Sequence, residues 1–226
     1  MRSIAIIPAR SGSKGLKDKN IKEFAGKPLL AHSIAAAAES GVFDEIMVST
    51  DSEEYAEIAR EWGANVPFLR SEATSADSAS SWDVVKEVLL GYKKMDSYFE
   101  AFCLLQPTSP LRTAQDVRNA CEKLQEVQTA VVSVCEADHS PVWYNQLPED
   151  LSLNGFINKS GDRQRQAFGK FYRVNGAIYF VKIAEFYKDS YIYREGSFAY
   201  IMDRKHSIDI DTEYDFKLAE IIRGVL

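Results

Sequence analysis

The sequence lacks the features that define several large classes of protein. Its formal net charge is −6, and this shortage of basic residues disfavours a general nucleic-acid binder. Its three cysteines, Cys103, Cys121 and Cys135, have neither the spacing of a metal site nor the even number of a disulfide framework. The apolar run at residues 4–7 is too short for a signal peptide or a membrane span. We therefore expect a cytoplasmic protein with buried, reduced thiols.

Two common nucleotide-binding signatures are also absent. Neither the Walker pattern Gly-x-x-x-x-Gly-Lys-Ser/Thr nor the dinucleotide fingerprint Gly-x-Gly-x-x-Gly occurs, and the second absence disfavours a nucleotide-dependent oxidoreductase. The chain has 226 residues, of which 46% are hydrophobic, and it contains no repeats or low-complexity tracts. This length and composition predict one folded domain with a substantial core.

Strand-like and helix-like segments alternate along most of the chain. Short apolar runs at 3–8, 45–49, 101–106 and 129–134 are typical of buried parallel strands. After Ser52, which is a suitable helix cap, apolar residues recur at helical spacing, and similar stripes follow the other runs. This alternation predicts a parallel sheet with helices on both of its faces.

The alternation stops between Glu136 and Phe171, where polar and turn-forming residues dominate. Arg165 belongs to a basic group within this stretch. A strand-like run resumes at 174–181, and a helix is expected from Thr212 onward. We predict a single domain over residues 1–226, with an inserted arm at about 136–171.

A loop rich in glycine and positive charge follows the first expected strand. In an open α/β sheet, ligands bind at the carboxyl ends of the strands, so the loop is well placed to bind one. Glycines such as Gly12 let the backbone approach a phosphate, while Arg10 and Lys14 supply positive charge. The loop at 8–15 therefore predicts phosphate binding, and the alternative is a flexible basic surface loop.

Two carboxylates alternate with apolar residues near the C-terminus. If the segment 207–211 is extended, Asp209 and Asp211 project to the same side. Adjacent carboxylates repel unless a cation or proton lies between them, and Mg²⁺ with nucleotide phosphates is a natural occupant. Alternatively, Asp211 helps to begin the last helix beside Thr212, and Asp209 is merely solvated. The residues alone leave both interpretations open.

These motifs together resemble the CMP-N-acylneuraminate (sialic acid) synthetase family. Four stretches carry the resemblance, in the family's order and spacing: IPARSGSKGL (7–16) with Lys19-Asn20, LR (69–70) with DSASS (77–81), LLQPTSPLR (104–112), and RVNGAIY (173–179) with SIDIDT (207–212). The resemblance implies a Rossmann-like nucleotidyltransferase fold, with a mostly parallel central sheet flanked by helices. It also implies CTP as donor, Mg²⁺ as cofactor, and a homodimer whose arm reaches toward the partner's active site.

The resemblance further assigns a set of residues to the nucleotide. These residues are Arg10, Ser11, Gly12, Lys14, Asn20, Arg70 and Ser81. Arg10 and Lys14 would also act in catalysis, by stabilising the charge that develops toward pyrophosphate. Without the family motif, Arg70 would be interpreted as a plain surface charge and Ser81 as a helix cap.

The sugar and the metal ion are assigned to other positions by the same resemblance. Gln106, Arg165 on the arm, and Tyr179 would contact the sugar, while Asp209 and Asp211 would hold a catalytic Mg²⁺. Taken by itself, Gln106 is a polar residue that closes a strand. Its place at the carboxyl end of that strand favours the site interpretation.

The arm departs from the family pattern at one position. After residues 139–141, sialate enzymes of the family often have a lysine, whereas this chain has Val142, Trp143 and Tyr144. A tryptophan favours packing against an apolar or N-acyl group over charge contact with a carboxylate. Residues 146–150 resemble relatives that use legionaminic acid, a bacterial sialate analogue. The expected sugar is therefore N-acetylneuraminic acid or N,N'-diacetyllegionaminic acid.

The expected reaction is transfer of CMP from CTP to the anomeric hydroxyl of this nine-carbon acidic sugar, with release of pyrophosphate. No residue type in the sequence identifies a general base. One alternative is a CMP-KDO synthetase, although its N-terminal loop typically differs from this one. Another is a non-catalytic nucleotide-sugar sensor, which would have little need to keep Arg10, Lys14, Asp209 and Asp211 together. Neither nucleic acid nor membrane is expected as a partner.

Overall fold

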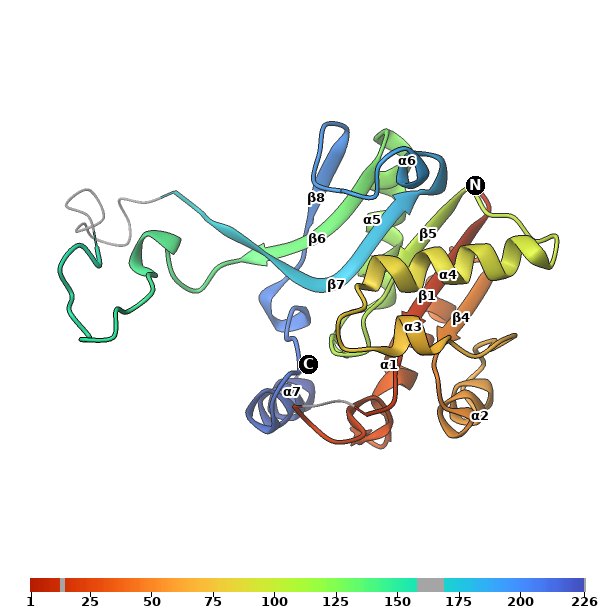
Figure 1. Ribbon diagram of the computed structural model, residues 1–226, viewed down its shortest axis with the longest axis horizontal. Helices are drawn as coiled ribbons and strands as arrows, with labels where there is room; N and C mark the ends of the chain where they lie inside the picture. The colour runs from red at the N-terminus through yellow and green to blue at the C-terminus, as the bar shows by residue number, and fades with distance from the viewer. Residues whose placement is uncertain (13–14, 158–168, 226) are drawn as a thin grey trace.

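A six-stranded, mostly parallel sheet forms the centre of the protein (Figure 1). The computed structural model describes residues 1–12, 15–157 and 169–225. The strands lie in the order β4-β1-β5-β7-β6-β8, and β7 alone among them runs antiparallel to its neighbours. Their bounds are Ser3–Pro8 (β1), Glu45–Ser49 (β4), Ala101–Leu104 (β5), Ala130–Glu136 (β6), Tyr172–Lys182 (β7) and Ser197–Ile201 (β8). The predicted Rossmann-like α/β architecture is confirmed.

Helices cover both faces of this sheet, as Figure 1 shows. Their bounds are Leu29–Ser40 (α1), Glu53–Glu61 (α2), Glu72–Ser75 (α3), Ser81–Lys94 (α4), Ala114–Glu126 (α5), Ile183–Lys188 (α6) and Glu213–Val225 (α7). Strand β1 contributes side chains to the hydrophobic cores on both faces of the sheet, because successive side chains of a strand point to opposite sides. Ala5 and Ile7 pack with α1, α2 and α5, whereas Ile4 and Ile6 pack with α4 and α6. Within the described part of the chain, no helix combines the length and apolar character needed to cross a bilayer.

Hydrogen-bonded caps fix where three of these helices begin. The Ser52 hydroxyl accepts from the Tyr55 backbone N–H at the start of α2, as the sequence predicts. Thr113 caps α5 in a reciprocal capping box. At α4 the cap is Ser80, so Ser81 is the first helical residue rather than the cap itself. This arrangement leaves the Ser81 side chain available for another contact.

The segment 207–211 would place Asp209 and Asp211 on one side if it were a strand, but it is not one: a short 3₁₀ turn at Arg204–His206 leads into irregular chain before α7. Tertiary contacts override the alternating pattern there. The Asn175-Gly176 pair lies inside β7, within the strand-like run at 174–181, near an irregularity in the pairing between Val132 and Val134 of β6.

The inserted arm leaves the sheet between β6 and β7 and projects away from the rest of the molecule (Figure 1). At its base, the Ala137 N–H donates to the Phe171 carbonyl at 2.8 Å. Farther out, the exposed apolar side chains include Tyr144, Leu147, Leu151, Leu153 and Ile157. The described part of the arm therefore has almost no core of its own.

Candidate active site

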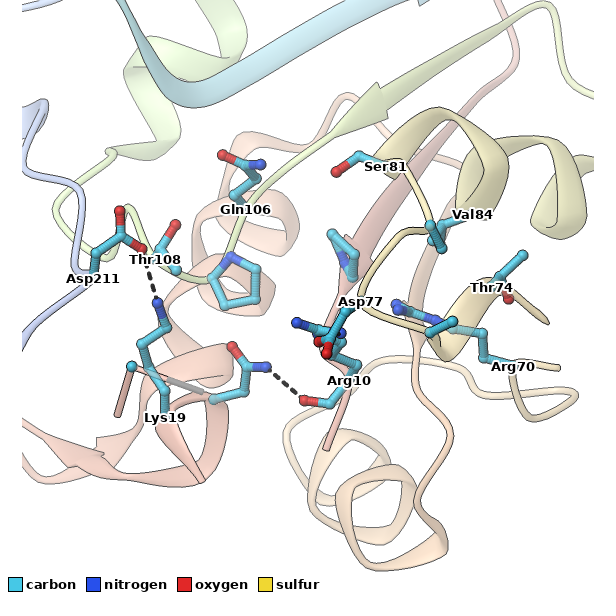
Figure 2. A pocket seen from close by; sticks show the side chains of 16 residues that line it. Arg10, Lys19, Arg70, Thr74, Asp77, Ser81, Val84, Gln106, Thr108 and Asp211 are labelled. Atoms are coloured by element: carbon cyan, nitrogen blue, oxygen red, sulfur yellow. Dashed lines mark hydrogen bonds and ion pairs between the residues drawn. The ribbon is translucent and has the colours of Figure 1, made fainter. Parts of the chain in front are cut away.

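A cleft of about 440 Å³ opens at the carboxyl ends of β1 and β5 (Figure 2). Its walls come from the loop after β1, the loop after β5, the start of α4, and the segment before α7. The lining residues are Pro8, Arg10, Gly15, Lys19, Asn20, Arg70, Thr74, Ala76, Asp77, Ala79, Ser81, Val84, Gln106, Pro107, Thr108 and Asp211. A larger hollow of about 680 Å³ lies beside α4 and contains none of the predicted site residues.

The cleft brings together six of the predicted site residues, from all four of the motif stretches: Arg10, Asn20, Arg70, Ser81, Gln106 and Asp211. Ser11 and Gly12 belong to the same loop as Arg10 but do not line the cleft. Lys14 and Arg165 lie outside the described residues, so their predicted roles stay predictions.

Arg70 is rigidly held at the back of the cleft. It is 8% exposed, and its guanidinium donates to the Ser49 hydroxyl at 3.1 Å and the Ser49 carbonyl at 2.6 Å. Burial lowers the pKa of Arg70 to about 10, although the charges of Asp51 and Glu87 oppose this shift. The side chain therefore stays charged at neutral pH in a fixed orientation, unlike a plain surface arginine.

The loop that carries Arg10 is tied down on both sides. The buried Asn20 side chain donates to the Arg10 carbonyl at 3.0 Å. The Ser11 backbone N–H and hydroxyl donate to the Asp51 carboxylate at 2.7 and 2.9 Å. Burial alone would raise the pKa of Asp51, but the Ser11 hydrogen bonds and the Arg70 charge outweigh it and hold the pKa below its ordinary value. In this loop, Ser11 and Asn20 shape the backbone, while the Arg10 side chain points into the cleft.

Lys19 is a cleft residue to which the sequence analysis gave no role. Its ammonium donates to the Ile210 carbonyl at 2.6 Å and to the Asp211 carboxylate at 3.1 Å (Figure 2). A Cβ on Gly15 would lie 2.8 Å from the Asp211 carbonyl oxygen, so the glycine lets the two segments meet. In the sequence, Lys19 is marked only by its place beside Asn20, in the motif that includes residues 7–16.

The two predicted metal ligands differ in environment. Burial raises the pKa of Asp209, aided by the Asp211 charge and opposed by a hydrogen bond from the Thr108 hydroxyl and by the Lys19 and Arg173 charges. One carboxylate oxygen of Asp209, Oδ1, is buried and has no hydrogen-bond partner among the described residues, while Asp211 is exposed.

This pair of carboxylates fits a divalent cation that also binds phosphate. An unpartnered buried carboxylate oxygen is costly unless it finds a donor or a cation. In the described part of the chain, no group of three or more His, Cys, Asp or Glu side chains forms a possible metal site. An ion between Asp209 and Asp211 would therefore take its remaining oxygens from ligand and water, which is how Mg²⁺ usually binds beside nucleotides.

Gly176 allows Gln106, one of the predicted sugar contacts, to approach β7. The glycine has a φ of +76°, and a Cβ there would lie 2.5 Å from Gln106 Oε1 and 3.6 Å from Asp209 Oδ2. The missing side chain thus brings Gln106 and Asp209 together against the same piece of backbone. A glycine inside a strand is a known sign of such a close approach.

Tyr179 lies on β7 but is not part of the cleft lining. Its ring packs edge-to-face on Trp82, with the ring centroids 5.6 Å apart. Burial raises its pKa, and the nearby charges of Tyr193 and Asp209 add to the shift. It therefore keeps its proton and is placed at the Asp209 side of the site as a neutral hydroxyl.

A charged cleft at the carboxyl ends of a mostly parallel sheet, with its bases on loops, is the arrangement of a nucleotide-binding α/β protein. The chain matches the model of the cytidylyltransferase family over residues 4–220. The protein belongs to this family of enzymes, and the resemblance inferred from its sequence motifs is confirmed.

Several characterised relatives are similar over nearly the whole chain. The CMP-N,N'-diacetyllegionaminic acid synthase of Legionella pneumophila is 36% identical over 224 residues, covering 97% of this chain and 95% of that protein. The pseudaminic acid cytidylyltransferase of Campylobacter jejuni is 34% identical over 228 residues, covering 100% and 97%. The N-acylneuraminate cytidylyltransferase of Escherichia coli is 38% identical over 222 residues, covering 97% of this chain but 52% of that protein. This chain thus spans about half the length of the last relative.

A solved structure shares the fold at low sequence identity. It is CMP:2-keto-3-deoxy-manno-octonic acid synthetase complexed with CTP, which superposes with a TM-score of 0.72 over 100% of both chains, at 14% identity. At this level of identity, the likeness concerns the fold alone.

Proposed function

We propose that the protein transfers CMP from CTP to the anomeric hydroxyl of a nine-carbon acidic sugar and releases pyrophosphate. The observation that carries this proposal is the meeting of three bases, Arg10, Lys19 and Arg70, with the Asp209–Asp211 pair in and beside one cleft. Relatives named for legionaminic, N-acylneuraminic and pseudaminic acids support the sugar class. N,N'-Diacetyllegionaminic and N-acetylneuraminic acids are the proposed substrates.

In this proposal, the nucleotide lies along the wall formed by Arg70 and Ser81. Arg70 is fixed by Ser49 and stays charged, and Ser81 stands at the N-terminus of the 14-residue helix α4, where backbone N–H groups favour anionic or polar ligands. The polyphosphate would extend toward Arg10, with Lys14 of the same loop as a further base. Ser11 and Gly12 shape that loop.

Asp209 and Asp211 would hold Mg²⁺ in this proposal. When bound, the ion supplies positive charge that polarises the α-phosphate and lowers the pKa of the attacking hydroxyl. Lys19 now pairs with Asp211, so it would either share that carboxylate or turn to the phosphates.

The sugar hydroxyl would attack the α-phosphorus in line, forming a new P–O bond as the bond to pyrophosphate breaks. Such chemistry depends mostly on positioning and on charge stabilisation. Gln106 would orient the sugar, while Arg10 and Lys14 would stabilise the charge that passes to the leaving group. Neither His206 nor His139 is proposed as the base, since His206 lies beside Asp116 at the start of α5 and His139 packs near Trp143 on the arm.

A homodimer and a cytoplasmic location complete the proposal. The second copy would cover the apolar residues that the arm exposes, and the arm's Arg165 and Trp143 would approach the partner's cleft. The three cysteines are buried and unpaired, and a reducing compartment would keep them so.

Pyrophosphate release in the presence of Mg²⁺ and CTP tests the proposed reaction. N-Acetylneuraminic, N,N'-diacetyllegionaminic, pseudaminic and KDO acids are compared side by side. We expect turnover with one of the first two acids. Turnover with KDO alone would favour a CMP-KDO synthetase, and no release with any acid from folded, CTP-binding protein would favour a non-catalytic sensor.

A further inference from the structure

Two of the three bases of the cleft, Arg10 and Lys19, already have carboxylate partners. Arg10 forms an ion pair with Asp77 at 2.8 Å, and Lys19 forms one with Asp211 at 3.1 Å. All four residues line the same cleft (Figure 2). A polyphosphate that binds these bases must therefore compete with two carboxylates. The proposed metal site gives Asp211 a second partner, whereas Asp77 has no assigned role.

Asp77 lies on a segment that is only lightly anchored. The short helix before it, α3, has no buried residue, and the Asp77 side chain is 51% exposed. Before Asp77, the segment is held by Glu87, which accepts hydrogen bonds from the Ser71 backbone N–H at 2.9 Å and from the Thr74 hydroxyl. After Asp77, it is held by the capping box of α4. Residues 75–79 span these two anchors and none of them is buried, which is typical of a segment that can shift locally.

We propose that Asp77 is an autoinhibitory partner of Arg10 in the free protein, and that the polyphosphate of the nucleotide must displace it in order to bind. This inference rests on the proposed nucleotide site. Breaking a partly exposed ion pair costs little free energy. A polyphosphate offsets this cost because it offers several charges to the same guanidinium. A nucleoside offers no charge and leaves the pair intact. Asp77 thereby lowers the affinity of the pocket for nucleotides that carry phosphates and leaves nucleoside binding unchanged.

The alternative role for Asp77 predicts the opposite sign. The guanidinium contacts Asp77 and the Ser75 carbonyl through a single nitrogen, Nη1, at 2.8 and 3.4 Å. An aspartate that stayed in place would orient Arg10 toward the phosphate, and its removal would weaken binding. The cleft-lining position of Asp77 favours displacement, because a retained carboxylate would repel the phosphates beside it.

The test measures equilibrium binding by calorimetry for the wild-type protein, Asp77→Asn and a matched control, Glu72→Gln. The control removes one negative charge from the same segment at a residue that does not line the cleft. The probes are Mg²⁺ with CTP, tripolyphosphate, and cytidine. We expect Asp77→Asn to bind CTP and tripolyphosphate about twofold to fivefold more tightly, which is the range for losing one partly exposed charge pair. Cytidine binding stays unchanged.

Any other result overturns either the proposed role of Asp77 or the proposed nucleotide site. Unchanged or weaker CTP binding by Asp77→Asn, or equal tightening by Glu72→Gln, overturns the displacement role. If the wild-type protein binds tripolyphosphate but no cytidine nucleotide, the proposed function falls while the tripolyphosphate result still decides the role of Asp77. Wild-type protein that binds neither overturns both.

Discussion

The roles of individual site residues depend more on their surroundings than on their chemical type. Gly176 is an example, because its position requires both a positive φ and the absence of a side chain. The backbone conformation is one that L side chains rarely adopt, and Gln106 occupies the space where a Cβ would stand. The residue thus determines where a neighbouring side chain lies, although it offers no functional group itself.

Replacing Gly176 with alanine should displace Gln106 and reduce turnover. A misplacement of about 1 Å at a reacting site can lower the rate by about 100-fold, and the strained backbone adds a stability loss of about 1–2 kcal/mol. The measurement is steady-state kinetics with varied sugar, together with the unfolding temperature. Gly63→Ala is the matched control: its φ is +92° but nothing lies within 4 Å of the added Cβ. A control that lost turnover equally would show that strain, not the contact with Gln106, causes the effect.

Asp209 is a second position where the surroundings define the role. An Asp209→Asn variant keeps the shape and removes the charge, so we expect turnover to fall by about 100-fold or more if the residue holds Mg²⁺. The second readout is thermal unfolding with CTP, with and without Mg²⁺. The wild-type protein should gain stability from the ion, as any ligand of the native state provides, and the variant should not.

Glu57→Gln, on the exposed face of α2, is the charge-matched control for this measurement. An Asp209→Asn protein that kept near-normal turnover and the full Mg²⁺-dependent stabilisation would remove the metal assignment.

At the scale of elements, a buried polar network places the acidic segment against the sheet. The Asn175 side chain on β7 donates to the Ser207 hydroxyl at 2.9 Å and accepts from the Ser133 hydroxyl at 2.6 Å. The Ser207 hydroxyl in turn donates to the Asp203 carbonyl at 2.7 Å. All three polar side chains are almost fully buried. This network connects β6 and β7 to the segment that carries Asp209. It therefore fixes the position of that segment relative to the sheet.

An Asn175→Ala change should cost about 1–3 kcal/mol of stability, because it removes the buried hydrogen bonds that Asn175 makes with the Ser133 and Ser207 hydroxyls. We also expect a higher Mg²⁺ concentration for half-maximal turnover, since the segment with Asp209 loses its support. Urea unfolding and Mg²⁺ titration of activity measure the two effects. Asn65→Ala is the control, as Asn65 is exposed and bonds Glu45 at 2.7 Å. A stability loss with an unchanged Mg²⁺ requirement would limit the network to a structural role.

The sequence predicted the elements better than it predicted their connections. Alternating apolar runs indicated the parallel strands, and cap residues such as Ser52 and Thr113 marked the helix starts, because both signals are local. The two-residue period of the segment 207–211 is compatible with a strand, but the segment is irregular. Its register is instead set by the network to Asn175 and by Ile210, which packs into a small core with Phe216. Such contacts between distant residues leave no periodic pattern.

The candidate site likewise combines residues that local motifs identify with contacts that only the folded chain reveals. Arg10, Asn20, Arg70 and Gln106 were assigned by their motifs, and the structure gathers them in one cleft. The Lys19–Asp211 pair joins residues 192 positions apart, so only the folded chain reveals it. The same holds for the insertion of β7 as an antiparallel strand between two parallel ones, since strand order is not encoded in local propensity.

At the scale of the whole molecule, two regions that expose several apolar side chains are the arm and the surface formed by the start of β7, the loop before β8 and β8 itself. The exposed side chains of the second region are Phe171, Tyr172, Val174, Tyr191, Tyr193, Phe198 and Ile201. Extended apolar patches of this kind mark association surfaces, and β8 is an edge strand that pairs only with β6 among the described residues. A second copy of the chain is the partner we propose for both regions.

Leu151 and Leu153 of the arm are each 69% exposed and are the positions to test this. The double change Leu151→Asp and Leu153→Asp should convert a dimer into a monomer, because it would bury charge in an apolar interface. The monomer should still bind CTP, whose cleft lies within one chain. It should lose most turnover, because in our proposal the arm of one copy completes the sugar site of the other.

Sedimentation velocity gives the mass of the assembly, and calorimetry with CTP separates folding defects from assembly defects. Leu90→Asp is the control, since Leu90 is 49% exposed on α4, outside both regions. Wild-type protein that is monomeric at full activity would contradict the dimer. A double variant that is monomeric but fully active would keep the dimer and remove the arm from catalysis, so that Arg165 and Trp143 would no longer be candidates for contact with the sugar.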